Sequence, residues 1–170
     1  MKSRLSASLL LVLMVAGGPA AGFAEPTEEA SSAPEPVAVW ETDYASALAR
    51  AHREHKLVLL DFTGSDWCIW CHRLHDQILA KKSFVDYARD NLVLVELDFP
   101  RKTPQSAELK SQNETLSGKF SVGGYPTIIM VDADGRELGR TGYMEGGPKT
   151  FVRELRRFAA KATPDAKATP

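Results

Sequence analysis

Two cysteines three residues apart, Cys68 and Cys71, are the side chains whose type and spacing best suit chemistry, and the sequence contains no others. An apolar run at residues 57–60 predicts a buried strand before them, and the apolar spacing from Cys71 onward predicts a helix. Cys68 therefore lies where a strand ends and a helix begins. Free N–H groups at a helix N-terminus favour an anion, so we expect a lowered pKa for the Cys68 thiol. Cys71 lies one turn further on, within reach for a disulfide.

The N-terminal segment indicates the compartment in which these cysteines work. Lys2 and Arg4 precede an apolar stretch at residues 9–16 that is too short to span a bilayer, and small residues follow at 22–24. This pattern predicts a cleaved signal peptide at residues 1–24, with an uncleaved membrane anchor as the alternative. We therefore expect a periplasmic or secreted protein with no stable membrane insertion after signal cleavage.

The cysteine count and the net charge exclude two classes of protein. Two cysteines three residues apart cannot form a multi-disulfide scaffold, and a bridge over so short a loop stabilises a fold only weakly. Redox chemistry therefore explains the cysteine pair better than stabilisation of the fold by a disulfide does. The formal net charge is −1, and losing the two cations Lys2 and Arg4 with the signal makes it −3. We accordingly expect no nucleic-acid partner.

The rest of the sequence predicts one domain at residues 40–160, between a disordered linker at 25–39 and a flexible tail at 161–170. In chain order, the predicted elements are a helix capped by Thr42 and ending near His55, a strand at 57–62, a helix from about Cys68, a helix at 83–90 capped by Ser83, a strand at 92–99, a helix at 105–120, strands at 127–131 and 136–141, and a last helix opened by Gly146, Gly147 and Pro148. Residues 132–135 predict a hairpin turn, so the last two strands are expected to be antiparallel.

Three separated motifs resemble the thioredoxin-like superfamily, in particular exported thiol–disulfide oxidoreductases. Residues 57–71 form a strand that ends in Asp-Phe and is followed by Trp-Cys-x-x-Cys. Residues 119–127, which include Tyr-Pro-Thr, resemble the loop that bears the family's cis-proline, and residues 131–136 with Gly142 beyond them are similar to the closing hairpin. A lone Cys-x-x-Cys is weak evidence, but the same motif between a strand and a helix, with Tyr-Pro-Thr about 55 residues later, is specific.

The resemblance implies an α/β thioredoxin-like fold, with a mixed four- to five-stranded sheet and helices on both faces. It implies that Cys68 attacks and that Cys71 resolves the mixed disulfide, without a bound cofactor. The expected partners are protein or peptide thiols and disulfides, and a redox partner at the membrane. The residues that would bind substrate are Trp67, Gly124, Tyr125 and Pro126.

Two carboxylates, Asp61 and Glu96, are candidates for supporting proton transfer. Asp61 lies seven residues before Cys68, whereas the family commonly has an aspartate six residues before its first cysteine, because the loop at 63–66 is one residue longer here. Asp61 therefore either accepts a proton or simply ends a strand. Glu96 is either a buried carboxylate that moves protons for the second cysteine or an end-of-strand residue facing solvent.

The residues between and beside the cysteines also depart from the family. Ile69 and Trp70 replace the family's Gly-Pro, a pair that helps to set the redox potential, and the sign of their effect is left open. Trp67 is expected to be a surface platform beside the reactive sulfur, whereas Trp70 is consistent with either core or surface.

Three other functions use the same residues. A thioredoxin-fold binding or chaperone-like module would need neither cysteine. A c-type haem protein fits residues 68–72, Cys-Ile-Trp-Cys-His, with Met130 or Met144 as the distal ligand. A metal site would use Cys68, Cys71, His72 and His75, although the first and last lie about 10 Å apart along a helix, too far for one tetrahedral zinc site. The favoured hypothesis remains a redox-active pair, with no metal.

Overall fold

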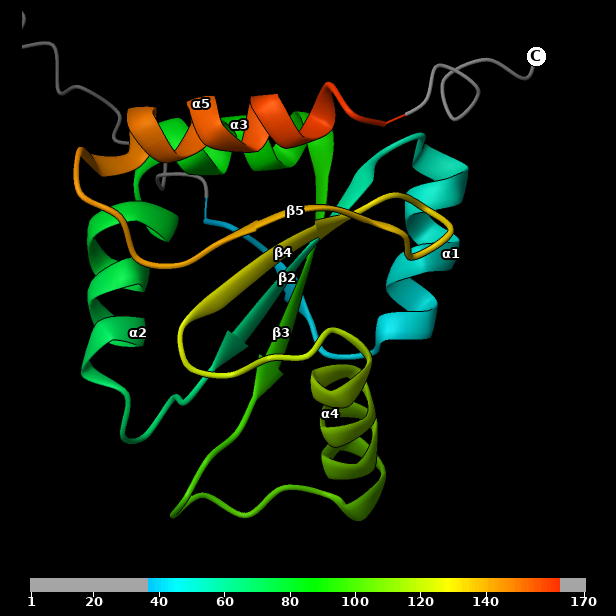
Figure 1. Ribbon diagram of the computed structural model, residues 1–170, viewed down its shortest axis with the longest axis vertical. Coiled ribbons are helices and arrows are strands. Elements are labelled where there is room, and N and C mark those ends of the chain that lie inside the picture. The colour runs from blue at the N-terminus through cyan, green and yellow to red at the C-terminus, as the bar shows by residue number, and fades with distance from the viewer. Residues whose placement is uncertain (1–36, 163–170) are drawn as a thin grey trace, which may run out of the picture. The chain divides into compact units, whose positions relative to one another are not determined.

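The computed structural model describes residues 37–162, which form a five-stranded sheet with helices on both faces (Figure 1). The strands are β1 (Trp40–Glu41), β2 (Leu57–Thr63), β3 (Leu92–Asp98), β4 (Thr127–Val131) and β5 (Glu137–Thr141). The helices are α1 (Tyr44–Glu54), α2 (Ile69–Leu74), the π-helical segment η1 (His75–Leu79), α3 (Lys82–Asn91), α4 (Ala107–Lys119) and α5 (Gly147–Ala159).

The strand order is β1-β3-β2-β4-β5. Strands β1 and β2 run parallel to β3, β4 runs antiparallel to β2, and β5 runs antiparallel to β4. This arrangement confirms the predicted α/β architecture and the predicted antiparallel closing pair. The predicted signal peptide, the linker up to residue 36 and the tail from residue 163 lie outside the described residues. Within residues 37–162, no helix is long and apolar enough to cross a membrane.

Alternation along β2 divides its side chains between two cores. Val58, Leu60 and Phe62 belong to the core covered by α1 and α4, whereas Leu59 belongs to the core covered by α2, η1, α3 and α5. Figure 1 shows these two groups of helices on opposite sides of the sheet. Asp61 is two residues after Leu59 in the strand, so both side chains point to the same face of the sheet, which is the face that α2 covers.

Two of the predicted helix caps are wrong. The N-cap of α1 is Asp43, whose carboxylate accepts the Ser46 N–H, and not the neighbouring Thr42. Helix α3 has Lys81 at its N-cap, with no side-chain capping bond, so Ser83 lies inside the first turn. Asp, Ser and Thr all cap well, and local sequence cannot choose between adjacent candidates.

Strand β1 was not predicted. It contains two residues, Trp40 and Glu41, which pair with Leu94 and Val95 of β3. Two residues are too few to show the alternation that marks a strand in a sequence. The strand is held by tertiary contact instead, because the Trp40 ring stacks on Phe84 of α3 with the ring centroids 6.5 Å apart.

Candidate active site

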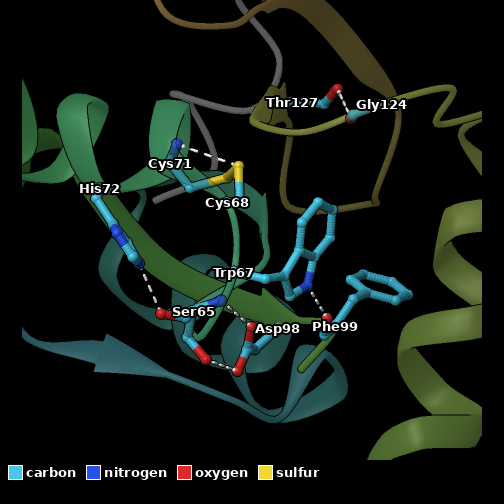
Figure 2. The surroundings of a disulfide bond; sticks show 9 residues. All are labelled: Ser65, Trp67, Cys68, Cys71, His72, Asp98, Phe99, Gly124 and Thr127. Carbon is cyan, nitrogen blue, oxygen red and sulfur yellow. Dashed lines mark hydrogen bonds between the residues drawn. A yellow bond between two sulfur atoms is a disulfide. The ribbon is translucent and has the colours of Figure 1, made fainter. Parts of the chain in front are cut away.

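Cys68 is the N-cap of α2 and forms a disulfide with Cys71 (Figure 2). Its Sγ accepts the Cys71 N–H at 3.2 Å, and its carbonyl oxygen accepts the His72 N–H at 3.1 Å. This geometry confirms the predicted strand-to-helix junction and the predicted pairing. Once the disulfide is reduced, the same N–H group can stabilise a thiolate at Cys68. Cys68 is 5% exposed and Cys71 is 4% exposed, so burial alone does not say which sulfur reacts first.

The two residues between the cysteines face solvent. Ile69 is 60% exposed and Trp70 is 47% exposed, which settles the open question about Trp70 in favour of the surface. The Trp70 ring contacts Tyr143, with the centroids 5.3 Å apart, and the Arg73 guanidinium lies 4.6 Å from its centroid. The disulfide is therefore bordered on one side by an apolar surface that a partner protein can contact.

The predicted substrate-binding residues lie together, with Trp67 against the loop that contains Gly124, Tyr125 and Pro126. The Trp67 ring meets Tyr125 edge to face with the centroids 5.6 Å apart, and the Tyr125–Pro126 peptide bond is cis. The carbonyl of Gly124 accepts the Thr127 hydroxyl at 2.7 Å (Figure 2). A Cβ atom added to Gly124 would contact nothing within 4 Å, so this loop borders open space.

The loop that is one residue longer than the family pattern is anchored to the last residue of β3 and to the segment that follows it. Asp98 accepts the Ser65 N–H at 2.8 Å and the Ser65 hydroxyl at 2.5 Å (Figure 2). The Trp67 indole N–H donates to the Phe99 carbonyl at 2.8 Å, and the ring Nε2 of His72 lies 2.7 Å from the Ser65 carbonyl. The extra residue therefore fastens the active-site loop instead of loosening it.

Asp66 completes this anchor. Its carboxylate accepts the backbone N–H groups of Arg101, Lys102 and Thr103 at 3.0, 2.7 and 2.9 Å. These N–H donors, that of Arg101 first, lower the pKa of Asp66 to about 2. The sequence reasoning missed Ser65, Asp66 and Asp98 as site residues, because their partners are more than 30 positions away in the chain.

The two candidate proton carriers, Asp61 and Glu96, are register partners in adjacent parallel strands. Asp61 is 7% exposed, and burial, followed by the charges of Glu96 and Asp98, raises its pKa to about 8. Burial and the Asp98 charge also raise the pKa of Glu96, and nearby His75 partly offsets this. Glu96 is half-buried, which lies between the two alternatives given for it, and its role in proton transfer stays a prediction. One Asp61 oxygen, Oδ1, has no hydrogen-bond partner among the described residues.

The metal-site and haem hypotheses each need particular side chains to lie in positions where they can bind the group. Within residues 37–162, no group of three or more His, Cys, Asp or Glu side chains is placed to hold a metal ion. Met130, one proposed axial haem ligand, is fully buried in the sheet and packs in the same core as Leu59. Met144, the other, is half-buried against that core.

Gly64→Ala should destabilise the fold and displace Trp67. A Cβ atom at Gly64 would lie 2.5–2.8 Å from three atoms of the indole, so the ring would have to leave its place against Phe99. We expect a loss of about 1–3 kcal/mol in unfolding free energy, measured by urea denaturation. Gly118→Ala is the matched control, because Gly118 lies within α4 with open space around it and should be neutral or slightly stabilising. Equal effects of the two substitutions would show that the Gly64 contact is unimportant.

Residues 44–159 match the family described as a thioredoxin-like domain. The chain is 40% identical over 117 residues to disulfide bond reductase DsbH of Chlamydia pneumoniae, covering 69% of this chain and 70% of that protein. A solved structure of DsbH oxidoreductase matches with a TM-score of 0.70 and 37% identity, covering 76% of this chain and 90% of that one. The thiol:disulfide interchange protein DsbD of Pseudoalteromonas atlantica is 29% identical over 106 residues, or 61% of this chain but 16% of DsbD.

Proposed function

This chain belongs to the thioredoxin-like domain family and is a thiol–disulfide oxidoreductase with a Cys-x-x-Cys active site, and we propose that it works as a reductant of disulfides in exported proteins. The observation that carries the exchange chemistry is the position of Cys68 Sγ at the N-cap of α2, where it accepts the N–H of its disulfide partner, Cys71. A thiol in this position is activated and has its resolving partner one helical turn away.

The proposed reaction moves two electrons from the protein to its partner. In the reduced protein the Cys68 thiolate attacks one sulfur of the partner disulfide, forming a mixed disulfide and expelling the other sulfur as a thiolate, which takes up a proton. Cys71 then loses its proton and attacks Cys68 Sγ. This step forms the Cys68–Cys71 disulfide and releases the second partner sulfur as a thiolate, which is protonated in turn.

We assign Asp61 the role of accepting the Cys71 proton. Asp61 lies on the sheet face that α2 covers, and its raised pKa of about 8 makes the ionised form of this carboxyl, which is the form that accepts a proton, a stronger base than an ordinary carboxylate. Glu96, beside it in the ladder, is the second carboxylate that supports this position. The longer loop is held by contacts of Ser65 with Asp98 and of Asp66 with the backbone N–H of Arg101.

Two observations support reduction over oxidation. The relative DsbH is named a disulfide bond reductase. In addition, the charge of Asp98, which helps to raise the pKa of both Asp61 and Glu96, lies on the α2 face, and negative charge there disfavours a thiolate. Destabilising the reduced form in this way makes a dithiol a stronger reductant, the reverse of what makes DsbA an oxidant.

The proposed compartment is the periplasm, with electrons supplied by a redox partner at the membrane. The signal-like pattern of residues 1–24 supports export. The likeness to DsbD is consistent with such a partner, although the match spans only 16% of that protein. Client proteins are expected to contact the exposed side chains of Ile69 and Trp70 and the loop that contains Tyr125.

The redox potential tests the direction of electron flow. We expect the Cys68–Cys71 couple to have a midpoint near that of thioredoxin, about −270 mV, and far from that of DsbA, about −120 mV. The midpoint can be measured by equilibrating the protein across a dithiothreitol series and tagging free thiols with a mass-shifting alkylator. A midpoint near −120 mV would make the protein an oxidant and overturn the proposal.

A further inference from the structure

The guanidinium of Arg101 lies over the indole of Trp67, with its central carbon 3.7 Å from the ring centroid. It is exposed to solvent, and it makes no ion pair within the described part of the chain. Several other arginines differ in this respect: Arg50, Arg89, Arg140 and Arg157 each contact a carboxylate. A cation beside the active site thus keeps its hydrogen-bond donors available for a bound molecule.

The backbone that carries Arg101 is held in place by the active-site loop. The carboxylate of Asp66 accepts the N–H groups of residues 101–103, and the Phe99 N–H donates to the Thr63 carbonyl at 2.9 Å. The Trp67 indole N–H fixes the Phe99 carbonyl in turn. The guanidinium is therefore pre-oriented, and binding an anion there costs less conformational entropy than it would for a freely rotating arginine.

Arg101 lies next to the residues that are expected to bind the substrate polypeptide. Trp67 precedes the reactive cysteine in the chain and contacts Tyr125 of the cis-proline loop, so Arg101 lies at the edge of the surface where a bound polypeptide would run. The nearby carboxylates are already engaged: Asp66 binds three backbone N–H groups, and Asp98 binds Ser65. Exposed Lys102 adds a second positive charge beside it.

We propose that Arg101, oriented by Trp67 and Asp66, is a specificity determinant that favours partner polypeptides with a carboxylate side chain close to the reactive cysteine. The guanidinium fork binds a carboxylate through two parallel N–H donors, which a neutral amide cannot match. This inference rests on the proposed reduction of partner disulfides, because it concerns which of those disulfides react fastest.

The test compares two synthetic peptides, each with one cysteine linked by a disulfide to a small chromogenic thiol. They are identical except that glutamates flank the cysteine in one and glutamines in the other. Protein reduced with dithiothreitol and then freed of it is mixed with each peptide, and release of the chromogenic thiol gives a second-order rate constant. The protein dithiol becomes the Cys68–Cys71 disulfide as each peptide disulfide is reduced to two thiols.

We expect the glutamate peptide to react about two- to fivefold faster at low salt, as an exposed ion pair allows, and to lose this advantage in about 1 M salt. Arg101→Gln should bring the ratio of the two rate constants close to one. Arg153→Gln removes the same charge from exposed α5 and should keep the preference. Asp66→Asn should weaken the preference although Arg101 remains.

Each other result has a distinct meaning. If Arg101→Gln and Arg153→Gln keep the same preference, or if the unaltered protein shows none, Arg101 does not read the partner and the inference is overturned. If the reduced protein reduces neither peptide faster than free dithiothreitol does at the same concentration, the proposed reductase function fails, and the inference fails with it.

Discussion

Cys71→Ser should trap this protein in covalent complexes with its partners and abolish its turnover. In the proposed reaction the mixed disulfide forms at Cys68, and only the Cys71 sulfur lies one helical turn away to release it. With serine at position 71 the attacking thiolate remains at the N-cap of α2, but its resolving group is absent. The complexes should be visible as higher-mass bands on non-reducing gels that disappear with dithiothreitol.

The complementary substitution assigns the two sulfurs. Cys68→Ser should form almost no complexes, because Cys71 lies inside α2 and lacks the free N–H groups that a cap position offers. The nearly equal burial of the two residues makes this comparison informative, since exposure alone would predict equal trapping. If Cys68→Ser traps as many partners as Cys71→Ser, the roles of the two cysteines are reversed. If neither traps any while the unaltered protein is active, the exchange mechanism is wrong.

The parts of the fold that sequence could predict are those recorded in local patterns. The strands at residues 57–62 and 127–131 are mostly apolar, with Asp61 and Thr127 as the exceptions, and the start of α2 at Cys68 follows from the change of periodicity there. Cysteines three residues apart on a helix also imply their own pairing. In these cases residues that are close together in the sequence are enough to predict the structure.

The parts that sequence could not predict depend on contacts between distant segments. The Asp66 carboxylate binds N–H groups at residues 101–103, and nothing in the local sequence distinguishes it from an ordinary loop aspartate. The longer loop looked like a reason to doubt the role of Asp61, yet its extra residue is accommodated by Ser65 and Asp98. Likewise, the raised pKa of Asp61 comes first from its burial and then from the charges of Glu96 and Asp98, which only the fold places around it.

Asp61 should lower the stability of the oxidised protein at neutral pH, because burial raises its pKa from 3.8 to about 8. Between these two values the folded protein keeps a proton that the unfolded chain has lost, so the free energy of unfolding falls as the pH rises. The slope is about 1.4 kcal/mol per pH unit, and the loss levels off above about pH 8. Below pH 3.8 both states are protonated and this cost vanishes.

Asp61→Asn should therefore stabilise the oxidised protein at pH 7 by up to about 4 kcal/mol, the slope multiplied by the roughly three pH units above 3.8. The gain should shrink toward zero near pH 4, as measured by urea denaturation across that range. Asp134→Asn, an exposed aspartate in the β4–β5 turn, is the control and should change stability by less than about 0.5 kcal/mol. A gain that is absent, or the same at pH 4 and pH 7, would mean that Asp61 does not hold a proton at neutral pH. An Asp61 carboxylate with an ordinary pKa would be a weaker base than the one proposed, so the same result would also weaken the case for proton transfer from Cys71 to Asp61.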